Sequence, residues 1–87
     1  MFLHVGNDVL VKIKDIVGIF DMENTTVSRL GRHFLSEAQK NNSVIYATED
    51  LPKSYVVVQS EGKTEVYISS MSTQVLSRRA ESSTITA

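Results

Sequence analysis

The segment that decides the fold is SYVVVQSEGKTEVYIS, residues 54–69. Residues 54–60 form a run rich in β-branched side chains, which favour strands, and residues 64–69 (TEVYIS) form a second strand-like run. Between them, Glu61-Gly62-Lys63 is a short connection that contains glycine. The segment therefore predicts a β-hairpin with a three-residue loop.

The residues before this hairpin predict further short strands. Residues 2–5 are apolar and end at the turn residues 6–8. Residues 9–14 alternate, with Val9, Val11 and Ile13 on one face. Residues 16–20 are apolar on both faces, which is typical of a strand covered on both sides, within the sheet or at a subunit contact. Gly18 in this run indicates a bulge or a close backbone approach.

Two helices are expected. The spacing of the apolar residues predicts a helix from Thr25 to about Asn41, and Asn24 or Thr25 can cap its N-terminus. Its apolar stripe consists of Val27, Leu30, Phe34, Leu35 and Ala38. A short strand follows at 43–47, and after the hairpin Ser72 can cap a last helix that ends near Ala80.

The expected order is thus β-β-β-α-β-β-β-α, which predicts an α+β fold with one mostly antiparallel sheet of about six short strands. We expect a single domain over residues 1–80 and a flexible C-terminal tail over residues 81–87. A domain this small, without disulfides, has a limited core, so association between subunits is expected.

Composition excludes several classes of protein. The 87 residues include no cysteine, which excludes a disulfide framework and thiol chemistry. The formal net charge of −1 indicates neither a nucleic-acid nor a membrane partner by itself. The first residues carry no basic leader, and no apolar run reaches the roughly 20 residues that span a bilayer, so we expect a cytoplasmic location and no membrane partner.

The sequence also lacks the patterns of catalytic and metal sites. His4 and His33 do not have the spacing of metal ligands, and the four glycines never cluster into a phosphate-binding loop. No nucleophile elbow is present. We therefore expect no catalytic residues, no metal, no cofactor and no enzymatic activity.

Positive charge is concentrated on the two expected helices, which carry all four arginines. Arg29, Arg32, His33 and Lys40 follow helical spacing on the face away from the apolar stripe. That arrangement suits a row of phosphate contacts. A solvated helix face, with Glu37 one turn from His33, explains the same positions.

Several strings together resemble one known family. They are His4-Val5-Gly6-x-Asp8, 14–21 (KDIVGIFD), Pro52-Lys53-Ser54-x-Val56-Val57, Val66-Tyr67-Ile68-Ser69 and Leu76-x-Arg78-Arg79-Ala80. Their order and spacing from residue 1 to about 80 resemble the RemB branch of the RemA/RemB extracellular matrix regulatory proteins of Firmicutes. None of the strings is a catalytic signature.

The resemblance implies a cytoplasmic regulator of biofilm matrix genes. The RemA branch is a DNA-binding transcriptional activator with a LytTR-like fold that assembles into rings. Its basic residues precede the isoleucine-rich strand and the hairpin. Here the first place holds Asp15, preceded by Lys12 and Lys14, and the second holds Lys53 after Glu49-Asp50.

Two functional hypotheses follow. In the first, the chain is a homo-oligomer, expected as a ring, that contacts double-stranded DNA through Lys12, Lys14, Lys53, Arg29 and Arg32. In the second, it is a protein-interaction module that modulates a paralogous regulator without binding DNA. A third hypothesis is a small-molecule sensor with a pocket between the first helix and the sheet, but the residues give it no specific support.

Assembly through apolar strands is a separate expectation. The residues expected to be buried between subunits are Ile16, Val17, Ile19 and Phe20, or Val56 and Val58 on an edge strand.

Overall fold

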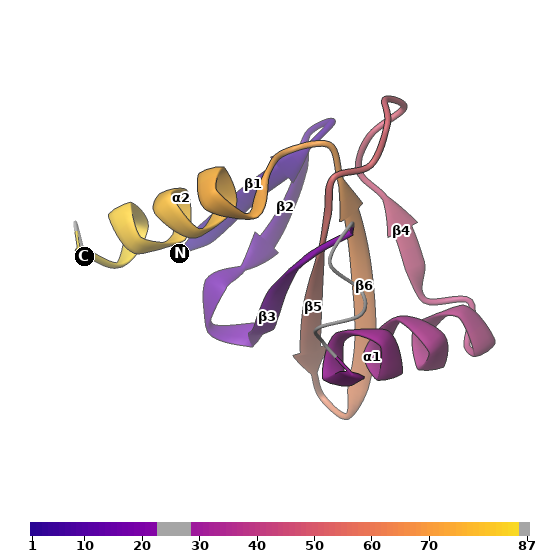
Figure 1. Ribbon diagram of the computed structural model, residues 1–87. Coiled ribbons are helices and arrows are strands. Elements are labelled where there is room, and N and C mark those ends of the chain that lie inside the picture. Colours follow the sequence, from indigo (N-terminus) through magenta and orange to yellow (C-terminus); the bar gives the residue numbers. More distant parts are fainter. Residues whose placement is uncertain (23–28, 86–87) are drawn as a thin grey trace.

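The computed structural model describes residues 1–22 and 29–85, with side chains described for residues 1–22 and 32–81. Six strands and two α-helices are present in this part of the chain (Figure 1). In chain order they are β1 (Phe2–Gly6), β2 (Val9–Lys12), the short 3-10 helix η1 (Ile13–Asp15), β3 (Ile16–Asp21), α1 (Arg29–Lys40), β4 (Val44–Tyr46), β5 (Ser54–Ser60), β6 (Lys63–Ser69) and α2 (Thr73–Ile85).

The strands form two sheets. The larger sheet has the order β3-β5-β6-β4, and the smaller one is the antiparallel pair β1-β2. The β3-β5 and β5-β6 pairs are antiparallel, whereas β4 pairs with β6 in parallel. The α+β class is therefore confirmed, but the expected single sheet of about six strands is wrong.

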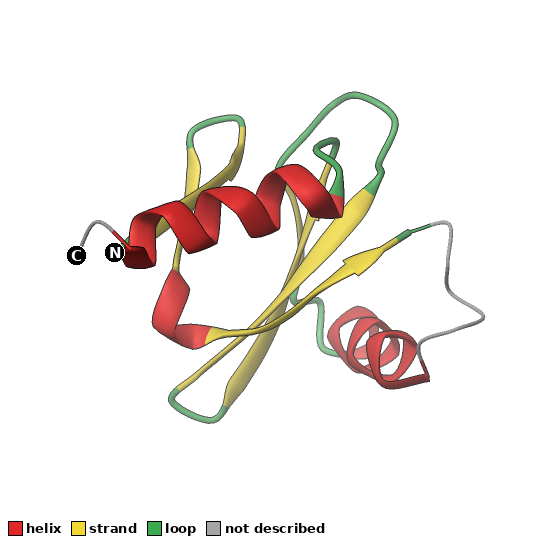
Figure 2. Ribbon diagram, turned by 60° about the vertical axis from the view of Figure 1, so that its left-hand side comes forward, coloured by secondary structure: helices red, strands yellow, loops and turns green. Residues whose placement is uncertain are grey.

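Strand β5 is the centre of the fold because its side chains supply both hydrophobic cores. Val56 and Val58 face one core, with Leu3 and Val5 of β1, Val11 of β2 and Leu76 of α2. Tyr55 and Val57 face the other, with Ala38 of α1 and Val66 and Ile68 of β6. The larger sheet thus lies between α1 on one face and the β1-β2 pair with α2 on the other (Figure 2).

The β5-β6 hairpin differs from its expected form by one residue. Ser60 pairs with Lys63, so the loop contains only Glu61 and Gly62. Both residues have positive φ, at 51° and 79°. A two-residue loop with both φ values positive matches the right-handed twist of the flanking strands, which explains why the shorter turn is adopted.

The segment expected as a strand over residues 9–14 ends earlier. Strand β2 ends at Lys12, and Ile13–Asp15 form η1, in which the Ile16 N–H donates to the Ile13 carbonyl. The bulge expected at Gly18 is confirmed, because the β3-β5 register shifts between Ile16 and Gly18.

The helix ends follow recognisable capping signals. Beyond α1, Asn42 has a φ of 54°, and the Ser43 N–H donates to the Ala38 carbonyl at 2.7 Å, which closes the helix as expected. The expected start of this helix, with its cap and Val27, lies outside the described residues, as does the side chain of Leu30. At α2, the Ser72 Oγ accepts a hydrogen bond from the Val75 N–H at 3.2 Å, which confirms the cap. Helix α2 continues to Ile85, beyond its expected end at Ala80.

A buried serine joins the two sheets. The Ser69 hydroxyl, at the end of β6, donates to the Val5 carbonyl of β1 at 2.8 Å and accepts from the Met71 N–H at 3.0 Å. Nearby, Gly6 has a φ of 138°, and a Cβ there would collide with the Ala47 carbonyl oxygen. One hydroxyl and one glycine thus add to the hydrophobic core in positioning the small sheet.

Candidate nucleic-acid interface

Two of the lysines expected to contact DNA lie together at η1. Lys12 is the last residue of β2, opposite Phe2, and Lys14 lies in η1. Between them, Ile13 donates its N–H to the Met1 carbonyl at 3.1 Å and packs against the core. The intervening residue thus turns inward while both lysine side chains are exposed. Neither lysine forms an ion pair with another residue of the described part of the chain.

These lysines border a hollow that has an apolar floor. We call it the N-terminal cleft; it has a volume of about 490 Å³ and is lined by Met1, Phe2, Lys12, Ile13 and Lys14. Phe2 is 55% exposed, and Leu10, which is on the same outward face of the β1-β2 pair, is 57% exposed. The cleft therefore combines exposed apolar surface with two ammonium groups.

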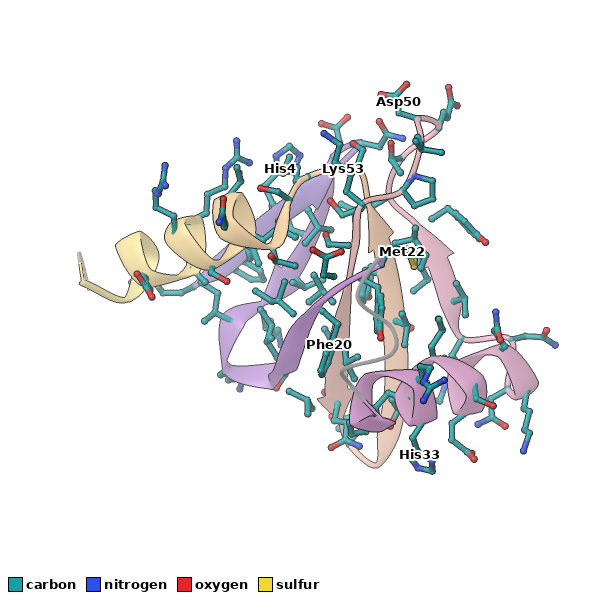
Figure 3. The ribbon with its side chains drawn as sticks, viewed as in Figure 1. His4, Phe20, Met22, His33, Asp50 and Lys53 are labelled. Carbon is teal, nitrogen blue, oxygen red and sulfur yellow. The ribbon has the colours of Figure 1, made fainter. Side chains whose placement is uncertain are left out.

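Lys53 lies at a different place. Its backbone joins β3 to β6, because its carbonyl accepts from the Met22 N–H at 2.9 Å and its N–H donates to the Ser69 carbonyl at 2.8 Å. Met22 follows the C-terminal end of β3, whereas Lys14 precedes the N-terminal end of that strand. The six extended residues of β3, which lie between the two positions, span about 17 Å. Figure 3 shows Lys53 at the same end of the molecule as Asp50.

The expected arginine contacts lie on a third element. Arg32 is exposed on α1, which packs against β6. The side chain of Arg29 lies outside the described residues. The five cations proposed for DNA contact thus do not form one patch; of the four described side chains, only Lys12 and Lys14 are neighbours.

The residues expected between subunits are partly used within the chain itself. Ile16 and Ile19 pack against the core that contains β1, while Phe20 stacks on Tyr55 with ring centroids 5.3 Å apart. Val17 is 43% exposed. Strand β3 has one partner, β5, so its other edge is unpaired within the described sheet.

The expectation for Val56 and Val58 needs a correction. Strand β5 is not an edge strand, because it lies between β3 and β6. Both side chains are already buried in the core of this chain. A second copy cannot be what buries them.

The exposed apolar residues were missed by the sequence reasoning. Leu51 precedes Pro52 in the loop before β5 and is 81% exposed. Phe2 and Leu10 lie outward in the small sheet, where Leu10 shares its face with Lys12. A leucine on the charged face of an alternating strand was the available signal for this surface.

Titratable groups do not gather into a candidate metal centre in the described part of the chain. No group of three His, Asp or Glu side chains that could hold a metal is found there. Figure 3 places His4 and His33 at different ends of the molecule. Burial raises the pKa of Tyr55, partly offset by the positive charge of Arg32. Burial, the charge of Glu65 and a hydrogen bond to that residue raise the pKa of Tyr67.

Two comparisons with known proteins settle the family. Residues 2–80 match the model of the RemA-like family, described as "Extracellular matrix regulatory protein A-like". This chain belongs to the RemA-like family. It is 33% identical over 81 residues to extracellular matrix regulatory protein B of Bacillus subtilis (strain 168), covering 93% of this chain and 91% of that relative. The match places the chain near RemB, as its sequence motifs indicate. No helix in the described ranges is long and apolar enough to cross a membrane.

Proposed function

We propose that this RemA-like chain is an oligomeric, cytoplasmic regulator of extracellular-matrix genes that contacts the backbone of duplex DNA, with no catalytic role. Its membership of a family of matrix regulators supports the regulatory part. The observation that carries the DNA part is the pair of exposed lysines at η1, Lys12 and Lys14, neither of which has a carboxylate partner among the described residues. Cations without a protein partner are available to phosphate oxygens.

The proposed contact depends on the addition of weak contributions from several copies. One chain presents Lys12 and Lys14 at η1, Lys53 beyond the other end of β3, and Arg32 on α1. Each phosphate contact contributes through counterion release, and a ring multiplies the number of contacts. The proposed contacts are single charged side chains on separate elements, so the proposal is binding by backbone charge and DNA shape. Arg29 belongs to the same proposed set.

Binding of the full chain to a fluorescent DNA duplex across a series of salt concentrations tests this proposal. We expect affinity to fall as salt rises. We expect the Lys12→Gln/Lys14→Gln variant to have a salt slope smaller by about 2 for each copy that contacts the DNA, one for each lost phosphate contact. The control is Lys63→Gln, which removes an exposed lysine outside the proposed set and is expected to leave the salt slope unchanged. A wild-type chain that does not bind at about 50 mM salt, or binds without a salt slope, contradicts the proposal.

A protein-interaction module that modulates a paralogous regulator is the second candidate. Two observations favour it: Lys53 has acidic neighbours in Glu49 and Asp50, and the N-terminal cleft exposes apolar side chains, which suit protein partners. This candidate predicts no DNA binding by the isolated chain at any salt concentration. It also predicts a complex with the paralogue that a mutation in the cleft, such as Phe2→Ser, weakens.

A further inference from the structure

The two arginines of α2 are cations that the DNA contact described above does not include. Arg78 and Arg79 are exposed, and neither forms an ion pair with another residue of the described part of the chain. Arg78 lies on the face of the helix opposite the buried Leu76, because two residues turn an α-helix by about 200°. A guanidinium presents a planar fork of N–H donors that matches phosphate oxygens, so both side chains are available to a phosphate.

One of these arginines is held in position by a residue that precedes the helix. The Arg79 Nη1 donates to the Met71 Sδ at 3.5 Å. Helical side chains point toward the helix N-terminus, which explains how Arg79 reaches a residue before the first turn of α2. The guanidinium is therefore fixed near the start of the helix, and its remaining donors are free for another acceptor.

Met71 in turn connects this arginine to Lys53. The Met71 carbonyl accepts from the Ser54 hydroxyl at 2.7 Å, and the Met71 N–H donates to the Ser69 hydroxyl at 3.0 Å. Lys53 directly precedes Ser54, and its own N–H donates to the Ser69 carbonyl at 2.8 Å. One short network of hydrogen bonds thus holds the guanidinium of Arg79 and the exposed Lys53 at the same end of the molecule.

The start of α2 adds positive potential at this end. The first turn of the helix carries no acidic side chain, and the positive end of a helix dipole favours an anion nearby. Exposed carboxylates of Glu49 and Asp50 lie in the loop before Lys53 and oppose this effect. Neither of them forms an ion pair with Lys53 among the described residues, so the ammonium group remains available.

Helix α2 extends from this end of the molecule to the other proposed lysine site. Two views show the far end of the helix beside the N-terminus of the chain (Figure 1 and Figure 2). There, Met1 lines the N-terminal cleft together with Lys12 and Lys14. Arg78 and Arg79 are the sixth and seventh of the 13 residues of α2. Their backbone therefore lies about midway along the helix that spans the distance between the two lysine sites.

We propose that Arg78 and Arg79 of α2 contact the DNA backbone. They connect Lys53 at one end of the helix to Lys12 and Lys14 at the other, which makes one phosphate-binding track of two separate sites. A duplex carries one phosphate charge for about every 1.7 Å of its axis, so a stretch as long as α2, about 20 Å, presents phosphates along the whole track. The inference rests on the DNA contact of the proposed function and adds the element that completes it.

The salt dependence of DNA binding tests the charge contribution of α2. With the full chain and the same fluorescent duplex, we expect Arg79→Gln to lower the salt slope by about 1 for each copy that contacts the DNA, and Arg78→Gln/Arg79→Gln to lower it by about 2. Arg78→Lys/Arg79→Lys keeps both charges and is expected to keep the slope. The matched control for the single variant is Lys63→Gln in the β5-β6 hairpin, which is expected to leave the slope unchanged.

A second measurement tests the position of α2 on the DNA. The chain contains no cysteine, so Ser77→Cys provides one attachment point for a chelated iron, on an exposed residue next to Arg78. With ascorbate and peroxide, the iron generates hydroxyl radicals, which are expected to cleave the backbone of the bound duplex near the label. Ser60→Cys, exposed at the end of β5, carries the same label as the control and is expected to leave the duplex intact.

The outcomes separate this inference from the proposed function. Glutamine, arginine and lysine have similar helix propensities, and circular dichroism establishes that each variant is folded. A wild-type chain that does not bind the duplex overturns both the proposed function and the inference. A wild-type chain that binds with a salt slope overturns the inference alone if Arg78→Gln/Arg79→Gln retains that slope, or if the labelled Ser77→Cys variant does not cleave the DNA.

Discussion

Strands β5 and β1 both bury alternate side chains, but they differ in what covers their second face. In β5, Tyr55 and Val57 are buried against α1, and Val56 and Val58 are buried against the small sheet and α2. In β1, Leu3 and Val5 are buried, whereas Phe2 and His4 are exposed. Both faces of β5 are thus covered within one chain, whereas the outer face of β1 is exposed. This outer face of the small sheet presents Phe2 and Leu10 to solvent.

Truncation of Leu76 tests whether α2 and the small sheet share one core. Leu76 is fully buried beside Leu3 and Val5. We expect Leu76→Ala to lower the free energy of unfolding by about 2–5 kcal/mol, because it leaves a cavity between α2 and β1. Urea denaturation measures the loss. The control is Val75→Ala, one residue earlier on the more exposed side of the helix, which is expected to change stability by about 0.5 kcal/mol or less. Equal losses in both variants would show that α2 is not docked as described.

Substitution of Gly6 tests the join between the two sheets. We expect Gly6→Ala to cost about 2–3 kcal/mol, because the new Cβ meets the Ala47 carbonyl and the φ of 138° suits glycine alone. In Gly62→Ala, the control, φ is also positive but no atom lies within 4 Å, so a cost of about 1 kcal/mol is expected. Chemical denaturation of both variants separates the collision from the backbone strain; similar costs would mean that the approach to Ala47 is not tight.

The sequence predicts the local elements of this fold better than their arrangement. Strand β5 is recovered with its bounds because a β-branched run is a local signal. The sequence does not predict the central position of this strand, because strand order depends on pairings between residues far apart in the chain, such as Ile16 with Val58. The loop length was wrong by one residue because Lys63, grouped with the turn, pairs with Ser60.

The candidate site shows the same limit. Lys12 and Lys14 are close in sequence and remain close in space. Lys53 was grouped with them on its charge and on the family resemblance, but its backbone bonds to Met22 and Ser69 place it at the opposite end of β3. The cleft itself was missed because Met1 and Phe2 reach η1 only through pairing of β1 with β2, which a single strand pattern does not reveal.

Removal of the Ser69 hydroxyl tests the hydrogen bonds that connect β6 to β1 of the small sheet. Ser69→Ala leaves the Val5 carbonyl and the Met71 N–H without this partner, and Val5 is fully buried. We expect a loss of about 1–2 kcal/mol in the free energy of unfolding. The control is Ser43→Ala, whose hydroxyl makes only an exposed 3.3 Å bond to the Asn41 carbonyl, and little change is expected. A loss no larger than the control's would mean that water replaces the hydroxyl.

Removal of the Tyr55 hydroxyl, in the core between the large sheet and α1, is expected to change stability least. This oxygen is buried and has no hydrogen-bond partner among the described residues. Tyr55→Phe is therefore expected to leave stability unchanged, or to raise it by up to about 1 kcal/mol at neutral pH, since no bond is lost and no polar atom stays buried.

The pH dependence of the same variant follows from the direction of the pKa shift. Burial raises the pKa of Tyr55 above its ordinary value of 10.0. Above pH 10 the unfolded chain therefore loses this proton while the folded chain keeps it, and the wild type loses stability as pH rises. Tyr55→Phe removes this part of the loss and retains the part due to Tyr67, whose pKa is also raised. Denaturation of both chains in parallel across this pH range measures the difference, and identical pH profiles would mean that water reaches the hydroxyl at the centre of the large sheet.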